Sequence, residues 1–174
     1  MTLKALILSH NSKQVWEEAA DRVLRSAKEL QELISYFEST DIRLVQRATQ
    51  IIGKVHDKDR AILKPYLIQM IKGLGDERID AYKRNVLRIF QTAEIPEQYE
   101  GHLFDHAFTF LEDNTEPVAI RAFAMTVCRK IAEKHPELAN EVTDAIKLIL
   151  EENESAGIQN RGGHELRRLK RLIG

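Results

Sequence analysis

The sequence predicts an all-α protein built from stacked helix pairs, and two observations support this prediction. Apolar residues recur with a period of 38 residues, first at Leu44, Tyr82, Ile120 and Ile158. Within each period, further apolar positions follow at steps of three and four residues, which is one stripe of an α-helix. A single helix pair cannot bury such a stripe, whereas a stack of pairs can. We therefore expect a right-handed α-α superhelix, or α-solenoid, of about four to five helix pairs.

The second helix of each pair keeps this register along most of its apolar face. The matching sets are Ala48, Val86, Ala124 and Gly162; Ile51, Ile89 and Val127; Ile52, Phe90, Cys128 and Leu166; and Val55, Ala93, Ile131 and Leu169. Only Glu165 breaks the pattern. The first helices repeat as well, so the period describes whole helix pairs.

Helix-start signals mark the boundaries of the repeats, and no long linker separates one repeat from the next. Ser26 and Glu29 form a capping-box pattern, which predicts two helices within 12–37. Pro96, Pro117 and Pro136 mark further helix starts, whereas Pro65 marks either a kink or a start. We expect one domain over 1–174, with a capping pair at 1–25 and repeats at 26–56, 58–93, 95–133 and 135–173.

Composition favours a globular protein of the reducing cytoplasm. The chain is 43% hydrophobic and 30% charged, with a net charge of −1. The apolar stretch 2–8 is far shorter than the roughly 20 residues of a membrane span, so we expect a first, capping helix there and no membrane association. Cys128 is the single cysteine and lies on an apolar stripe, which predicts a buried structural thiol.

The intra-pair turns and the helices after them resemble HEAT repeats. The resemblance rests on Asp76 followed by Tyr82 and Lys83, and on Asp113 followed by Ile120 and Arg121. It implies that the basic residue pairs with a turn aspartate, forming a ladder along the stack. Two units depart from the pattern, with Val45 and Gln159 at the basic position. The resemblance covers nearly the whole chain and implies an architecture used by scaffolds, adaptors and a few enzymes.

The stretch 154–162 also resembles the ending of a group of short bacterial HEAT-like chains to which the name adenylosuccinate lyase is sometimes attached. That lyase family is a much longer helical enzyme with a flexible loop rich in Ser, Met, Lys and Asn near a catalytic serine. This sequence has no counterpart of the loop, so the name lacks support here.

The sequence contains no recognisable catalytic centre, and we expect neither a metal nor a cofactor. His102 and His106 are one helical turn apart, a spacing that could seat a transition metal, but Leu103 stands where zinc proteases have glutamate. Alternatively, both histidines lie on the solvent-exposed flank of a helix and bind no metal. The Gly73–Gly75 segment lacks the strand that precedes a phosphate loop. We therefore predict a protein that is not an enzyme.

Charge is segregated between the two sets of helices. The second-helix windows 42–56, 78–92, 119–132 and 158–172 hold fifteen basic and two acidic residues, whereas window 97–112 of a first helix holds acids only. Ten basic residues project on one arc away from the apolar stripe, and we take them as the candidate partner-binding residues. These are Arg43, Arg47, Lys54, Arg84, Arg88, Arg129, Lys130, Arg161, Arg167 and Arg168.

This arc supports a non-catalytic scaffold or adaptor that binds an acidic or phosphorylated segment of a partner protein. One alternative is a solvated face with weak ion pairs. A second is nucleic-acid binding, as in the HEAT-like bacterial alkylpurine DNA glycosylases, which depend on groove aromatics; here the only tryptophan is Trp16. A lyase is the lowest alternative.

Overall fold

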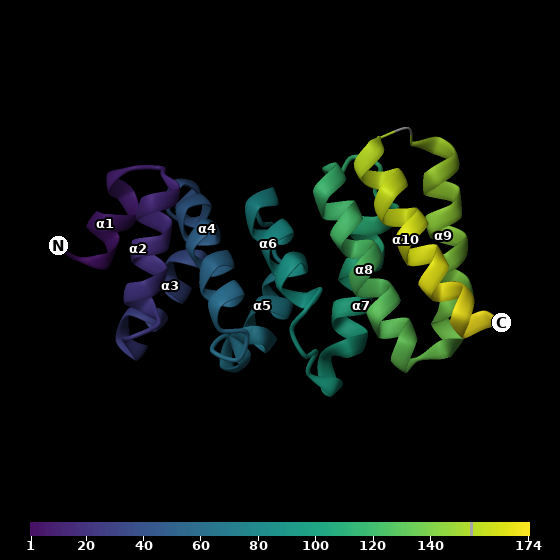
Figure 1. The fold of residues 1–174 in the computed structure, drawn as a ribbon, viewed down its shortest axis with the longest axis horizontal. Helices are drawn as coiled ribbons and strands as arrows, with labels where there is room; N and C mark the ends of the chain where they lie inside the picture. The colour runs from purple at the N-terminus through teal and green to yellow at the C-terminus, as the bar shows by residue number, and fades with distance from the viewer. Residues whose placement is uncertain (154) are drawn as a thin grey trace. The chain divides into compact units, whose positions relative to one another are not determined.

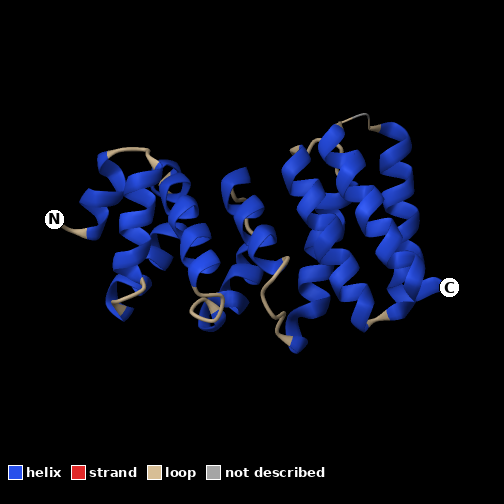
Figure 2. Cartoon of the chain, viewed as in Figure 1, coloured by secondary structure: helices blue, strands red, loops and turns tan. Residues whose placement is uncertain are grey.

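The computed structural model describes residues 1–153 and 155–174, and within them the chain forms helices and no strand (Figure 2). The predicted all-α fold class is confirmed. Glu154, with which the lyase-like stretch begins, lies outside the described residues. Among the described helices, none combines the length and the apolar character that crossing a membrane requires.

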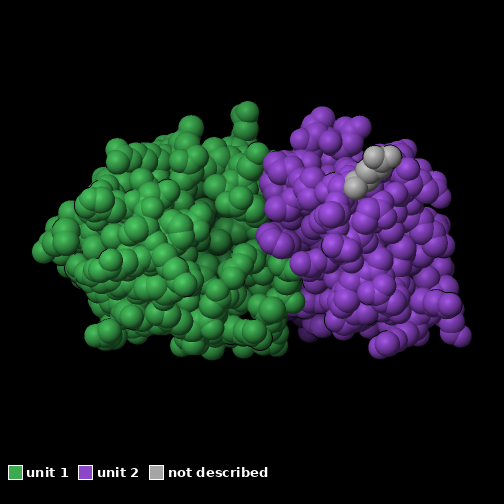
Figure 3. Space-filling view, turned by 45° about the horizontal axis from the view of Figure 1, so that its top comes forward, with its two compact units in different colours: residues 1–94 green, residues 95–174 purple. Residues whose placement is uncertain are grey.

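The chain divides into two compact units, residues 1–94 and 95–174 (Figure 3). The division falls between the expected repeats 58–93 and 95–133. We describe each unit by itself.

Unit 1 is a two-layer arrangement of helices (Figure 1). Its second helices form one layer, in which α2 packs against α4 and α4 against α6. Among the first helices, α1 packs against α2 and α3 packs against α4. The elements are α1 (Leu3–Ser9), α2 (Lys13–Val23), α3 (Ala27–Phe37), α4 (Ile42–Lys58), the 3₁₀ helix η1 (Lys64–Tyr66), α5 (Leu67–Gly73) and α6 (Asp80–Phe90).

Unit 2 is built in the same way. Its first helices α7 and α9 pack against each other, its second helices α8 and α10 do likewise, and α8 contacts both first helices. The elements are η2 (Glu97–Tyr99), α7 (Glu100–Glu112), α8 (Val118–Lys134), η3 (Pro136–Leu138), α9 (Ala139–Glu152) and α10 (Ala156–Ile173).

Local sequence signals account for the helix boundaries. Ser26 Oγ accepts a hydrogen bond from the amide of Glu29 at 3.3 Å, so α2 and α3 are separate helices, as the capping pattern predicts. Asp41 caps α4 in the same way through the amide of Leu44, at 3.1 Å. Pro65 lies inside η1, immediately before α5, and so marks a helix start rather than a kink. The stretch 2–8 forms the expected first helix, α1.

The 38-residue register describes the core. Leu44, Tyr82, Ile120 and Ile158 are all buried. Cys128 is also buried, and burial raises the pKa of its thiol, as expected of a structural cysteine. The position that breaks the apolar pattern, Glu165, is only 1% exposed, so this carboxylate lies inside unit 2.

Candidate interaction surfaces

Three arginines meet at one polar pocket in unit 1, which we call the three-arginine pocket. Its volume is about 410 Å³, and its walls come from α4, α6 and the turn after α1. The lining residues are Asn11, Arg43, Gln46, Arg47, Thr49, Gln50, Ala81 and Arg84. The lining therefore carries three guanidinium groups, three side-chain amides and no carboxylate.

Helical spacing places these side chains together. Arg43, Gln46, Arg47 and Gln50 follow one another on α4 at steps that keep them on one side of the helix. That side is opposite the buried stripe of α4, so its long polar side chains point away from the core. The neighbouring helix α6 contributes Arg84.

Arg47 is the unusual member of the pocket. Its side chain is half-buried, and its Nη1 atom is buried without a hydrogen-bond partner in the structure. A buried guanidinium nitrogen that makes no hydrogen bond raises the free energy of the folded protein. Arg43 and Arg84 are exposed at the same pocket.

The equivalent position in unit 2 shows a contrasting arrangement. Arg161 lies three 38-residue periods after Arg47. Its Nη1 donates a hydrogen bond to Thr126 Oγ1 at 2.7 Å, and its guanidinium lies 5.8 Å from the ring centre of Phe123. The same register position thus carries an arginine whose Nη1 is hydrogen-bonded in unit 2 and one whose Nη1 has no hydrogen-bond partner in unit 1.

The groove between α8 and α10 also differs in composition. It holds about 770 Å³ and is lined by Val118, Ala119, Ala122, Gly157, Asn160, Arg161 and His164. Ala119 and Ala122 stand one repeat interval from Ala81 and Arg84. Because this related groove forms with small side chains, the helix-pair architecture does not itself require a cluster of arginines.

Two other predicted residues of unit 1 are neutralised by carboxylates. Lys54 Nζ lies 2.8 Å from Glu17 Oε1, and Arg88 Nη2 donates to both oxygens of Asp57 at 3.0 and 2.9 Å. The hydrogen bonds from Lys54 and Lys58 lower the pKa of Glu17 to about 2. The positive charge of the second helices in unit 1 is therefore concentrated at the three-arginine pocket.

Most of the predicted basic residues of unit 2 are also engaged within the unit. Arg168 donates to Glu133 at 3.0 Å, and Arg129 is buried. Lys130 is half-buried, and burial, aided by the charge of Arg129, lowers its pKa to about 8. Arg167 is exposed on α10.

Glu165 is the centre of a buried network that the charge count did not anticipate. Its carboxylate accepts hydrogen bonds from Thr126 Oγ1 at 2.6 Å and from Arg129 Nε at 2.8 Å. Burial favours the neutral acid, but these hydrogen bonds and the charge of Arg129 outweigh it and lower the pKa of Glu165. The sequence did contain a signal for this buried network, because Glu165 is an acidic residue at an apolar position of the repeat.

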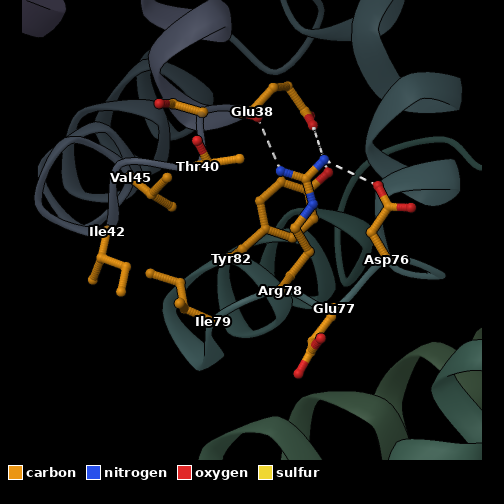
Figure 4. Close-up of a pocket in the computed structure, with 10 residues that line it drawn as sticks. Glu38, Thr40, Ile42, Val45, Asp76, Glu77, Arg78, Ile79 and Tyr82 are labelled. Atoms are coloured by element: carbon orange, nitrogen blue, oxygen red, sulfur yellow. Dashed lines mark hydrogen bonds and ion pairs between the residues drawn. The ribbon is translucent and has the colours of Figure 1, made fainter.

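A second pocket of unit 1, about 650 Å³ in volume, lies beside the turn between α5 and α6. Its arginine is bonded internally: Arg78 donates to Glu38 at 3.0 Å and to Asp76 at 3.2 Å (Figure 4). The hydroxyl of Tyr82 also donates to Glu38, at 2.9 Å. Burial raises the pKa of Glu38 despite these partners. This network holds α3 and α6 together within unit 1.

An acidic groove of about 900 Å³ runs along the first helices of unit 2. Glu100 in this groove is buried and bonded to Lys134 and to His135 Nε2, the latter at 2.7 Å. The stacked rings of Phe104 and Phe108, 5.4 Å apart, form part of the wall. The acid-rich first helices of the sequence thus correspond to an acidic surface feature.

The remaining candidates carry less chemistry. His102 is exposed and His106 is half-buried, with its pKa lowered by burial; the described residues hold no group of three potential metal ligands around them. At the expected ladder position, Arg121 donates from Nε to the carbonyl of Leu111 at 3.0 Å, so it bonds the C-terminal turn of α7.

Comparison with known proteins identifies the architecture. The family model described as a HEAT repeat domain matches residues 3–162. The chain belongs to the HEAT-repeat family. No curated protein and no solved structure matches it. The expected HEAT-type fold is therefore confirmed, and the adenylosuccinate lyase name gains no support.

Proposed function

We propose that this HEAT-repeat protein is a non-catalytic interaction module that binds an acidic segment of a partner protein at the three-arginine pocket. HEAT repeats commonly mediate protein–protein interactions, which is the general part of this function. The acidic partner is the specific part. One observation carries it: a polar pocket lined by Arg43, Arg47 and Arg84 with no carboxylate, in which Arg47 Nη1 is buried and unsatisfied.

The chemistry of the lining supports an anionic ligand. Guanidinium groups bind carboxylates through paired hydrogen bonds, and such charge-assisted bonds are stronger than neutral ones. A carboxylate of the partner would accept hydrogen bonds from the guanidinium groups that line the pocket. The proposal does not include the rest of the predicted arc: Lys54 and Arg88 already pair with Glu17 and Asp57, and Arg167 is not a lining residue of the pocket.

Nucleic-acid binding is the second candidate, and the distribution of charge argues against it. Binding to a nucleic-acid backbone draws on many phosphate contacts along a basic track. In unit 1 the track is interrupted where Lys54 and Arg88 pair with acids. A confined pocket suits a single acidic group better than a continuous backbone.

Fluorescence anisotropy with a labelled peptide of alternating Glu and Gly tests the proposal. We expect saturable binding by the full chain that weakens with added salt and is lost in the triple variant R43Q/R47Q/R84Q. The triple variant R167Q/K170Q/R171Q is the matched control, because it removes the same charge from exposed residues of α10 outside the pocket. Equal binding by the two variants would overturn the proposal, and tighter binding of duplex DNA than of the peptide would favour the second candidate.

A further inference from the structure

The three-arginine pocket offers more positive charge than one carboxylate can neutralise. Its lining contains three guanidinium groups and no acid. A carboxylate carries one negative charge and two oxygens, so one bidentate contact with an arginine uses both oxygens. A phosphomonoester carries a charge of about −1.5 to −2 at pH 7 and three terminal oxygens.

The three arginines also differ in how deeply they are buried. Arg47 is half-buried between its neighbours, whereas Arg43 and Arg84 are exposed and extend from different helices, α4 and α6. A half-buried guanidinium has less rotamer freedom to lose on binding than an exposed one, which lowers the entropic cost of contacting it. The two exposed arginines are then positioned to contact the remaining oxygens of a larger anion.

The neutral lining residues fit the same ligand. Asn11, Gln46 and Gln50 bring side-chain amides that donate hydrogen bonds without adding charge. Thr49 is less available, since its hydroxyl already donates to the carbonyl of Gln46 at 2.8 Å. The volume of 410 Å³ is at the small end of the roughly 300–1,000 Å³ of small-molecule pockets, which suits one phosphorylated side chain.

We infer that the three-arginine pocket takes the phosphate group of a phosphorylated side chain of the partner protein, an inference that rests on the function proposed above. A phosphorylated protein segment fits better than a nucleic acid for two reasons. A backbone phosphodiester has one negative charge and two free oxygens, which leaves two of the three guanidinium charges unneutralised, whereas a phosphomonoester leaves about one. It also draws on flanking basic residues, and Arg88 on α6 is already neutralised by Asp57.

The comparison of the two units indicates that the three arginines serve ligand binding rather than the packing of the helix pairs. The related groove between α8 and α10 has Ala119 and Ala122 among its lining residues, together with the single arginine Arg161. Arg161 is bonded to Thr126 within the unit, whereas Arg47 Nη1 has no such bond. The three arginines are therefore an addition to the repeat framework rather than part of it.

The test is an NMR titration that follows the arginine Nε–Hε signals of the full chain. The small ligands are inorganic phosphate and acetate. The others are three short peptides that differ only at one position, which is phosphoserine, glutamate or serine. We expect saturable shifts of the Arg47 signal, with phosphate and the phosphoserine peptide bound at least about tenfold tighter than acetate and the glutamate peptide. Replacing an exposed arginine, as in R43Q or R84Q, should weaken phosphate binding about tenfold. R47K keeps the positive charge but lacks the paired N–H donors of a guanidinium, so it should reduce the preference for phosphate, whereas R171Q, at an exposed residue of α10 outside the pocket, should leave binding unchanged.

The outcomes separate this inference from the function on which it rests. Equal affinity for the glutamate and phosphoserine peptides, with loss of both in R43Q and R84Q, would overturn the phosphate inference and leave the acidic-partner proposal intact. Failure of every anion to bind, or unchanged phosphate binding in R43Q and R84Q, would overturn the assignment of this pocket altogether. Displacement of the phosphoserine peptide by duplex DNA at lower concentration than by inorganic phosphate would assign the pocket to nucleic acid instead.

Discussion

Arg129 donates a hydrogen bond from Nε to Glu165 Oε2 at 2.8 Å, and the two side chains are 4% and 1% exposed. This pair joins α8 to α10, and Glu165 occupies a position where the other repeats place isoleucine or valine. Arg129 also contacts Glu133 on its own helix, at 2.7 Å. A buried charge pair of this kind is costly to break on one side, because the remaining charge stays desolvated.

The first prediction concerns this pair directly. R129M should lower the free energy of unfolding by about 3–5 kcal/mol, because Glu165 would be left buried without its main partner. The double variant R129M/E165L should recover most of that loss, because it leaves no buried carboxylate without its partner and places an apolar side chain at the stripe position 165. Urea unfolding of the two variants measures the difference. If R129M/E165L were as unstable as R129M, the cost would lie in packing rather than in charge.

The pH dependence of stability follows from the same carboxylate. The pKa of Glu165 is lowered from its ordinary value of 4.5, with Arg129 and Thr126 as donors and with His164 Nδ1 3.5 Å away. A group with a depressed folded pKa stabilises the protein above its unfolded pKa, and that contribution is lost as the pH falls through the folded pKa. Stability should therefore decline below about pH 4.5.

E165Q tests this assignment, because the amide does not titrate. The acid-dependent loss of stability should be smaller in E165Q than in the unmodified protein, as measured by urea unfolding at a series of pH values. It should not vanish, because the hydrogen bonds from Lys134 and His135 also lower the pKa of Glu100. If E165Q lost as much stability at low pH as the unmodified protein, the pKa of Glu165 would be the same in the folded and the unfolded chain, which would contradict the assignment.

Alanine substitutions at two glycines, one closely packed and one open, test the packing of the helices. A Cβ at Gly73 would overlap the hydroxyl oxygen of Tyr82, whereas a Cβ at Gly101 would meet nothing within 4 Å. G73A should therefore destabilise the protein by about 1–3 kcal/mol through overpacking. G101A, on the exposed side of α7, should be neutral or stabilising by about 0.5–1 kcal/mol. Thermal or urea unfolding distinguishes the two, and equal stabilities would contradict the close approach of Tyr82.

Cys128 reports on the opening of unit 2. The thiol is buried, and burial raises its pKa, so both access and thiolate formation are suppressed in the folded protein. Labelling with a thiol reagent should be slow under native conditions and complete in denaturant. Adding R129M should accelerate labelling in proportion to the loss of stability. Rapid labelling of the unmodified protein would contradict the buried position of this side chain.

The helix-pair framework was predictable from the sequence because burial repeats with the chain. Leu44, Tyr82, Ile120 and Ile158 share one environment, so their apolar character recurs at one interval. The boundary at Ser26 was predictable for a different reason, since its hydroxyl satisfies an amide at a helix start whatever the tertiary context. Both signals are local or periodic, and the structure follows them.

The binding surface was less predictable, because pairing depends on side chains that are distant in sequence. The helical projection placed Arg47, Lys54 and Arg88 on one arc. It had no means of showing that Glu17 reaches Lys54 from α2 and that Asp57 reaches Arg88 from α4. The charge count of the second-helix windows included Glu165 as an acid, although its place on the apolar stripe indicated burial. Only the three-dimensional arrangement separates Arg47 from the basic residues that are already bonded.

The comparison of the two triple variants tests the central claim most directly, because both lose the same charge and only one loses the pocket. The account predicts that R43Q/R47Q/R84Q abolishes saturable binding of the glutamate-containing peptide while R167Q/K170Q/R171Q retains it. Retention of binding in R43Q/R47Q/R84Q, or equal loss in both variants, would contradict a binding site at Arg43, Arg47 and Arg84.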